Sequence, residues 1–374
     1  MEQSNSRSRI FGLDLMRAAA IILVLFGHCA WIFPKSNTAF TALMALSGFL
    51  GVEVFFVLSG FLIGRIIYRE FVKGDFTIRS VMHFLRRRWF RTFPNYFLIL
   101  IVNILIAFYI GYSIDGLWKY FFFVQNFASP MLPFFTESWS LSVEELAYFL
   151  LPFALLAAFS VAKPKDRSLR FLTVTLLLIA TFIITKVVYN SHHLVTTLEE
   201  WNLAVKSVVI FRLDSIFIGV LCAWIYENYR NFWKKTQMFW MFCGMTMIGF
   251  YTFGVGRFQI GIERFPFFWN VIYLPLSSLT VAFFLPMLSE WKTEKSFIRK
   301  PVTFISLISY SVYLVHYGIV LQLLKQFVDT ESLPFLHGAL FTAAYLAITI
   351  VLSYLLYRFY EKPMMDRRET SNAQ

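Results

Sequence analysis

Charged residues are scarce in this chain of 374 residues, where Lys, Arg, Asp and Glu together make up only 15% of the composition. A soluble protein of similar length would carry about a quarter. Hydrophobic residues make up 58% and aromatic residues 20%, and the mean hydropathy is +0.63. Because the apolar residues fall in long blocks, the sequence predicts an all-α polytopic membrane protein.

Cysteine is also rare, and the three cysteines all lie within apolar blocks. An odd number without metal-ligand spacing argues against a disulfide framework and against a zinc site, so we expect no metal. The net charge of +12 would suggest a nucleic-acid ligand in a soluble protein. Here the positions of the basic residues beside the apolar blocks explain it better, and we expect contact with membrane lipids and no nucleic-acid partner.

About ten apolar segments are each close to the ~20 residues that cross a bilayer. They are residues 11–33, 46–68, 93–112, 142–161, 170–189, 204–227, 237–255, 267–288, 303–325 and 336–359.

Basic residues are unevenly divided between the two sides of these segments. Of the 34 Lys and Arg, 26 fall on the side that holds both ends of the chain. By the positive-inside rule we expect both termini to be cytoplasmic. The expected organisation is a tail over 1–9, a transmembrane domain over 10–363 and a tail over 364–374, in the cell (inner) membrane. We expect neither a cleavable signal peptide nor an attached soluble domain.

The first segment contains the most informative ionisable residues. Arg17 and His28 are eleven residues apart, which is about 16 Å along a helix and roughly half of the hydrocarbon thickness. Ionisable groups at such depths face a protein interior or a watery cavity and indicate a functional site. We expect a chemical role for His28. Asp14, three residues before Arg17, shares its face and either pairs with it or contacts a ligand.

Other polar residues in or near the segments allow two interpretations each. For Arg212 and Asp214, a structural ion pair is as plausible as contact with a ligand. His316 is more often a satisfied core histidine than a reactive one, and Glu53 could face external water. Ser140 fits a hydrogen-bonding residue at a helix start.

A basic loop precedes the third segment. Arg87, Arg88 and Arg91 lie in this loop, and Pro94 follows at the start of the segment. The planar fork of arginine suits phosphate, so this cluster is expected to hold a polyanion such as a nucleotide cofactor at the cytoplasmic mouth. Anionic lipid headgroups are the competing ligand.

Six motifs together resemble acyltransferase family 3 of integral-membrane acyltransferases, over about residues 9 to 363. They are Arg17 with His28; the segment from Gly51 to Leu62; Arg87, Arg88 and Arg91 with Pro94 and Tyr96; the run from Trp139 to Glu144; Arg212 with Asp214 and Gly219; and the run from Ser309 to His316.

The resemblance implies ten spans and transfer of an acyl group from cytoplasmic acyl-CoA, with acetyl-CoA foremost. The implied acceptor is a hydroxyl of an extracytoplasmic or lipid-linked molecule, usually a glycan. Some members carry a fused extracytoplasmic hydrolase-like domain. We expect a stand-alone member, which completes the transfer alone or passes the acyl group to a partner.

Acyl transfer to an alcohol needs a base for the hydroxyl proton and stabilisation of the oxyanion. A neutral imidazole suits the first task, so we expect His28 to be the general base, with a transient acyl-histidine as the alternative. Glu144 is expected to orient the imidazole, as the acid does in a catalytic triad. Arg17 and Arg212 are expected to stabilise the oxyanion or bind the phosphates of the donor.

Two other functions use some of the same residues. A transporter or flippase of an anionic lipid-linked substrate would need the arginines but no base. A membrane sensor would need neither, and the intact Arg17, His28 and Glu144 argue against it.

Overall fold

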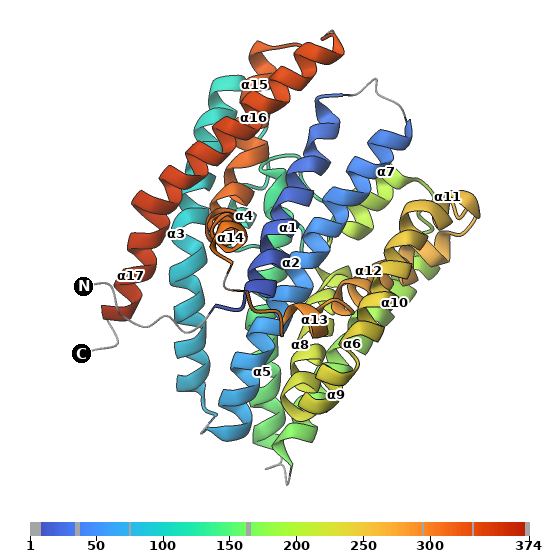
Figure 1. Cartoon of the computed structure of the whole chain (residues 1–374), viewed down its shortest axis with the longest axis vertical. Helices are drawn as coiled ribbons and strands as arrows, with labels where there is room; N and C mark the ends of the chain where they lie inside the picture. Colours follow the sequence, from blue (N-terminus) through green and yellow to red (C-terminus); the bar gives the residue numbers. More distant parts are fainter. Residues whose placement is uncertain are drawn as a thin grey trace.

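The computed structural model describes residues 9–33, 38–74, 76–161, 166–293, 295–330 and 333–370. Within these ranges the chain is helical and contains no strand, so the predicted all-α fold is confirmed. Nine helices in the described ranges are long and apolar enough to cross a membrane. The protein is therefore a multi-pass membrane protein (Figure 1).

The helical elements follow one another along the chain. The α-helices are α1 (Phe11–His28), α2 (Thr38–Lys73), α3 (Ile78–Ile110), α4 (Trp118–Phe121), α5 (Trp139–Val161), α6 (Arg167–His192), α7 (Leu198–Trp201), α8 (Leu213–Asn228), α9 (Arg230–Lys235), α10 (Gln237–Gly249), α11 (Val255–Arg257), α12 (Tyr273–Ala282), α13 (Leu285–Leu288), α14 (Ser296–Val315), α15 (Gln322–Phe327), α16 (Phe335–Leu356) and α17 (Lys362–Thr370).

Short 3₁₀ and π-helical segments connect or extend these helices. The 3₁₀ segments are η1 (Cys29–Trp31), η2 (Thr136–Ser138) and η4 (Val209–Phe211). The π-helical segments are η3 (Asn202–Lys206), η5 (Phe250–Gly254), η6 (Phe268–Ile272), η7 (His316–Leu321) and η8 (Tyr357–Glu361).

The segment predicted as the sixth span differs from the other nine. Its helix α8 has 16 residues, which is about 24 Å and shorter than the hydrocarbon core. The short segments η3 and η4 precede it in place of further helical turns. Most of α8 is buried by its neighbours, so it is an internal element of the bundle.

The helices α1, α2 and α8 form the centre of the bundle, with α5, α12 and α14 beside them. Glycines allow the closest approach: a Cβ atom on Gly60 of α2 would collide with the backbone of Ile216, and one on Gly219 with the backbone of Val57. Close packing through small residues is a usual way to associate helices in a membrane. The helix α10 lies at the periphery, with only 11% of its apolar window buried, against 56% for α2.

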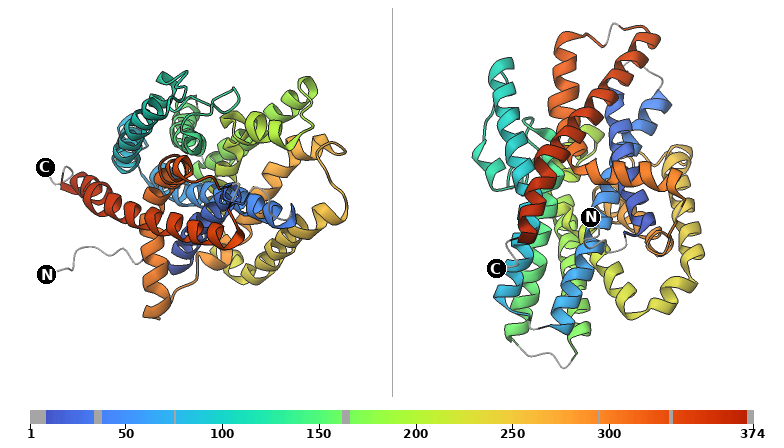
Figure 2. Two further views of the ribbon diagram at one scale, coloured as in Figure 1. Left: turned by 90° about the horizontal axis from the view of Figure 1, so that it is seen from above. Right: turned by 60° about the vertical axis from the view of Figure 1, so that its left-hand side comes forward.

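Two elements depart from the expected layout. The helix α3 runs without interruption from Ile78 to Ile110 and contains Pro94, so the basic segment before Pro94 is helical and not a loop. The predicted span 303–325 consists of the end of α14, then η7 and α15. Figure 1 views α14 nearly end-on, and Figure 2 shows it lying across the direction of α1 and α2.

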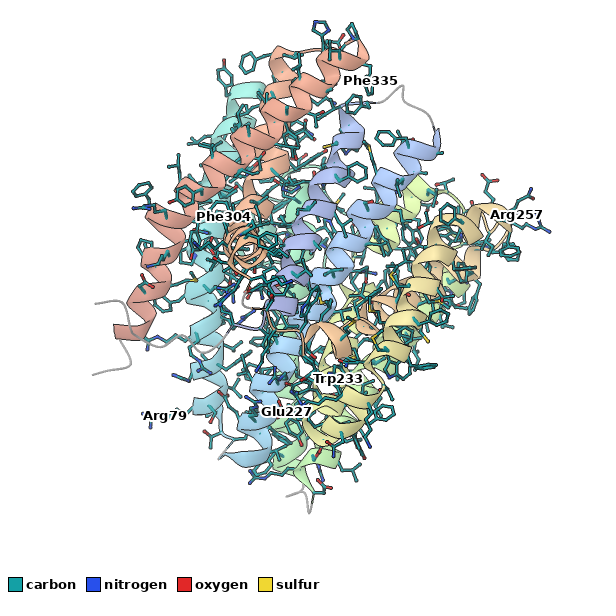
Figure 3. All side chains as sticks on the ribbon, viewed as in Figure 1. Arg79, Glu227, Trp233, Arg257, Phe304 and Phe335 are labelled. Atoms are coloured by element: carbon teal, nitrogen blue, oxygen red, sulfur yellow. The ribbon has the colours of Figure 1, made fainter. Side chains whose placement is uncertain are left out.

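Successive connections alternate between the two ends of the bundle. Figure 3 places Arg79 and Glu227 towards one end, and Arg257 and Phe335 towards the other. The first two belong to the side expected to be cytoplasmic and the last two to the external side. The arrangement agrees with the alternation of the spans, and the assignment of each end to a compartment stays a prediction.

Reporter fusions test that assignment. Fusions after residues 75, 165, 232, 295 and 368 should score cytoplasmic, and fusions after 115, 195, 260 and 330 should score external. The reason is that 26 of the 34 basic residues fall on one side. Two or more reversed reporters would contradict the topology.

Candidate functional site

A cavity with an empty volume of about 790 Å³, counted out to its mouth, lies between α1, α2, α3, α5 and α14. Its lining consists of polar and aromatic side chains on an apolar background: Arg17, Val52, Phe55, Leu58, Ser59, Leu62, Arg88, Arg91, Thr92, Ser140, Leu141, Glu144, Ser309, Tyr310 and Tyr313. Five of the six motifs singled out in the sequence contribute to it. The sequence therefore identified residues that the fold brings together from distant parts of the chain.

Three guanidinium groups line this cavity, those of Arg17, Arg88 and Arg91. Arg88 lies over the ring of Tyr148, with its Cζ atom 4.6 Å from the ring centroid, and its Nε atom has no hydrogen-bond partner. Among the ion pairs of the described residues, neither Arg88 nor Arg91 has a carboxylate oxygen within 4.0 Å. The cavity thus holds positive charge that the protein does not directly neutralise.

Arg87 is separated from the other two arginines of its motif. Its Nη2 atom donates to Glu70 Oε1 of α2 at 2.9 Å, and it does not line the cavity. Residue 91 is three residues from 88 and four from 87, so helix geometry allows either arginine to lie beside Arg91. The pair with Glu70 of α2 holds Arg87 elsewhere. The structure therefore brings Arg88 and Arg91 together with Arg17 and leaves Arg87 outside the cavity lining, while the role of these arginines in binding a cofactor stays a prediction.

Asp14 and Arg17 do lie on one face of α1, as expected. Their closest nitrogen–oxygen distance is 3.8 Å, between Arg17 Nη1 and Asp14 Oδ1. Asp14 is held more closely by Arg9, which donates from Nε at 2.8 Å and from Nη2 at 2.7 Å, and by the hydroxyl of Ser306 at 3.0 Å. Because Asp14 has these partners, Arg17 keeps much of its capacity to bind an anion in the cavity.

The carboxylates near the cavity are bound to neutral groups. Glu144 accepts from the hydroxyl of Tyr148 at 2.7 Å, and this hydroxyl also contacts Ser59. Glu145 accepts from Thr92 at 2.9 Å. These contacts fix the carboxylates beside the guanidinium groups.

His28 is the C-terminal residue of α1, eleven residues beyond Arg17. Eleven residues are about three complete turns, so both side chains emerge from the same face of α1. His28 Nδ1 lies 3.0 Å from the carbonyl oxygen of Val24 and 3.3 Å from His316 Nε2. The ring of Tyr317 packs on His28 with a centroid distance of 4.8 Å. His28 is half-buried, whereas His316 is fully buried.

His28 contacts the carbonyl oxygen of Val24 and the side chain of His316, and not Glu144 as expected. The imidazole nitrogen available for an orienting partner faces Val24 and His316, and Glu144 faces the cavity beside Tyr148. His316, which we expected to be more often a core residue, is the side chain that contacts His28.

Tyr313 lies between the cavity and the two histidines. Its hydroxyl oxygen is 2.6 Å from that of Ser140 and donates to the carbonyl oxygen of Glu137 at 3.0 Å. Its ring lines the cavity on one side and lies 5.6 Å from the ring of His316 on the other. Ser140 therefore anchors this tyrosine, in agreement with the hydrogen-bonding role expected for it.

Sequence reasoning missed Glu137 and Glu361. Glu137 is buried in η2, where Oε1 accepts from the amide of Gly318 at 2.9 Å and Oε2 has no hydrogen-bond partner. Glu361 is buried near the end of the last long helix and accepts from Asn95 and Ser311. Both lie just outside the predicted spans 142–161 and 336–359, and no local pattern distinguishes them from solvated carboxylates.

Arg212 and Asp214 do not pair with each other, and each forms an ion pair with a residue of another helix. Arg212 pairs with Glu53 of α2, and Asp214 pairs with Lys186 of α6 at 2.5 Å, with all four side chains fully buried. Residues two apart point in different directions at a helix start, so they reach different neighbours. Glu53, considered as a residue facing external water, has no exposed surface and also accepts from Ser278 at 2.8 Å.

The sequence was compared with known protein families and with curated proteins. A family model described as an acyltransferase domain matches residues 10–358. The chain belongs to acyltransferase family 3.

Curated relatives of this family member include the O-acetyltransferase OatA of Staphylococcus aureus, 23% identical over 387 residues that cover 98% of this chain and 59% of the relative. The peptidoglycan O-acetyltransferase OatA of Listeria monocytogenes is 28% identical over 167 residues, covering 40% of this chain and 25% of that protein. The chain covers less than two thirds of the length of these relatives. No solved structure matches it.

The buried ion pairs predict that charge removal destabilises the protein more in its interior than at its surface. Glu53→Gln leaves the guanidinium of Arg212 buried without a counter-charge, which should lower the free energy of unfolding by about 3–5 kcal/mol. Asp366→Asn is the matched control, because it breaks the exposed pair of Asp366 with Lys362, and it should cost less than about 0.5 kcal/mol. Thermal unfolding of both variants in detergent measures the difference, and equal midpoints would contradict it.

Proposed function

We propose that the protein is a membrane O-acyltransferase that uses cytoplasmic acyl-CoA, with acetyl-CoA foremost. The acceptor is a hydroxyl of a cell-surface or lipid-linked glycan. The observation that carries the proposal is one helix face that joins an arginine-lined cavity to a half-buried histidine. The family membership and the names of the relatives support the same class of reaction.

The cavity suits the donor by its charge. Coenzyme A carries phosphate groups, and arginine binds phosphate in a bidentate manner. Arg88 and Arg91 lie side by side in the cavity and are not neutralised by a carboxylate within 4.0 Å, and the Nε atom of Arg88 lacks a partner. These groups would hold the phosphates, and the apolar part of the lining, including Phe55 and Leu58, would contact the rest of the donor.

The separation of Arg17 and His28 divides their tasks. Arg17 lies about 16 Å from His28 along α1, too far to stabilise an oxyanion that forms beside the imidazole. We therefore propose that Arg17 binds the donor together with Arg88 and Arg91. Arg212 is enclosed with Glu53, so its role in this proposal is to hold the bundle together.

His28 supplies the base. As the acceptor oxygen bonds to the acyl carbon, its proton passes to the imidazole, the carbon–sulfur bond breaks, and the imidazolium returns the proton to the thiolate. General base catalysis of this kind contributes about 10²–10⁴-fold to a rate. The half-buried position of His28 leaves part of its ring accessible to a substrate.

Removal of the imidazole tests the proposal. His28→Ala in membrane vesicles should abolish the transfer of label from radiolabelled acetyl-CoA to surface glycans, because the base acts in the transition state. Binding of unlabelled CoA to the purified variant, measured by calorimetry, should be unchanged. Substantial label transfer by the variant would exclude His28 as the base. A wild-type protein that transfers no label and moves a lipid-linked glycan across vesicles would favour the transporter.

Substitution of the arginines tests donor binding. Arg88→Ala and Arg91→Ala should each raise the KM for acetyl-CoA about tenfold or more, with a smaller effect on kcat, because each removes a phosphate contact of about 1.5–3 kcal/mol. Arg88→Lys should recover part of the loss, since it keeps the charge but not the fork.

Arg87→Ala is the matched control on the same helix. It breaks the half-exposed pair with Glu70 and should leave the KM unchanged. An equal rise in KM for Arg87→Ala, or a normal KM in a folded Arg88→Ala, Arg91→Ala double variant, would remove these arginines from the donor site.

A further inference from the structure

Three contacts surround the histidine pair and together define where its protons lie. His316 Nδ1 is 2.8 Å from the carbonyl oxygen of Tyr313. His28 Nδ1 is 3.0 Å from the carbonyl oxygen of Val24 and 3.3 Å from His316 Nε2. A carbonyl oxygen only accepts hydrogen bonds, whereas each imidazole nitrogen donates or accepts according to the tautomer.

One combination of neutral tautomers makes all three contacts favourable. If both rings carry their proton on Nδ1, His316 donates to Tyr313, and the single Nδ1–H of His28 is shared between the carbonyl oxygen of Val24 and the unprotonated Nε2 of His316. If His28 carries its proton on Nε2 instead, its Nδ1 lone pair faces the carbonyl oxygen of Val24. If His316 carries its proton on Nε2, its Nδ1 lone pair faces the carbonyl oxygen of Tyr313. Unfavourable contacts of this kind are expensive where water is excluded.

We infer that His316 is the positioning residue of the reaction, which accepts the Nδ1 proton of His28 and so leaves the Nε2 lone pair of His28 free to act as the base. This inference rests on the proposed function and extends it. His316 takes the part that we expected for Glu144. It stabilises the imidazolium of His28 through the same nitrogen–hydrogen bond that sets the tautomer.

The surroundings of His316 hold it for this task. It is fully buried and begins the π-helical segment η7, an irregularity that often marks functional sites. Two residues further on, the amide of Gly318 donates to Glu137 Oε1 at 2.9 Å. A Cβ atom on Gly318 would lie 2.7 Å from Asn103 Oδ1 and 2.8 Å from Glu137 Oε1, so this glycine lets η7 pack closely against η2 and α3.

A neutral partner has a physical advantage at this depth. A carboxylate opposite His28 would have to be desolvated in the resting state, at a cost that a neutral imidazole avoids. When Nε2 of His28 takes the proton of the acceptor hydroxyl, the new positive charge is shared through Nδ1–H with His316. The proton returns from Nε2 to the departing thiolate, and both rings regain their starting tautomers.

Kinetic measurement of His316 variants tests the inference. His316→Leu should lower kcat about 10²-fold or more without a change in the KM for acetyl-CoA, since the donor cavity is not altered. His316→Gln should recover part of kcat, because its amide oxygen can accept from His28 Nδ1. His337→Leu is the matched control, since it makes the same substitution at an exposed histidine of α16; it should retain kcat.

The outcomes separate this inference from the proposed function. Loss of activity in His28→Ala with full kcat in His316→Leu would overturn the inference alone. Activity in His28→Ala would overturn the proposed mechanism itself. Equal losses in the Leu and Gln variants would assign His316 to packing and overturn its role as an acceptor.

A spectroscopic measurement is independent of the variants of His316. Nitrogen-15 solid-state NMR of histidine-labelled protein, with His28 assigned by comparison with His28→Asn, should show a protonated Nδ1 and an unprotonated Nε2 on His28. A protonated Nε2 at neutral pH would overturn the inference.

Discussion

The absence of water from the interior of a membrane bundle is the constraint on which the rest of this structure depends. Each buried charge needs a partner inside the protein, because an unpaired one costs several kcal/mol. The two enclosed pairs, Arg212 with Glu53 and Lys186 with Asp214, satisfy this requirement across three different helices. Against that background, guanidinium groups without a close carboxylate are exceptional. The positions of Arg88 and Arg91 in the cavity therefore support the proposal that this cavity binds an anion.

The geometry of α1 links this place to the reactive side chain. An interval of eleven residues is about three turns, so a single helix presents Arg17 to the cavity and His28 to the opposite half of the membrane along one face. Neighbouring helices complete each end separately. The helices α3 and α5 bring Arg88, Arg91 and Glu144 to one end, and η7 brings His316 and Tyr317 to the other. In the proposed function, donor binding and proton transfer therefore take place at different depths of the same bundle.

The sequence predicted what depends on local periodicity and failed where partners come from other helices. Apolar blocks located the spans, and a three-residue interval placed Asp14 beside Arg17. The same rule does not separate Arg87 from Arg91, which is four residues further along α3. Arg87 is kept apart by its pair with Glu70, which depends on how α2 packs against α3. The partners of Arg212 and Asp214 depend on how α2 and α6 pack against α8, which glycines such as Gly60 and Gly219 permit. Neither the His28–His316 contact nor the burial of Glu137 has a local signal, because both arise only when η7 packs between α1 and η2.

Tyr313 lies between the two ends of the site, the arginine-lined cavity and the histidine pair. Its ring stands between the cavity and His316, and its hydroxyl is held by Ser140 and by the carbonyl oxygen of Glu137. In the proposed function, a donor anchored at Arg88 that reacts beside His28 extends past this ring. Displacing the ring would break two buried hydrogen bonds, each worth about 0.5–1.5 kcal/mol, and the polar lining offers the donor new ones. The binding energy of the anchored phosphates can offset that cost, which would make access to the histidine pair depend on a correctly bound donor. The route from the cavity to the histidine pair would then stay closed by the ring of Tyr313 until a donor binds.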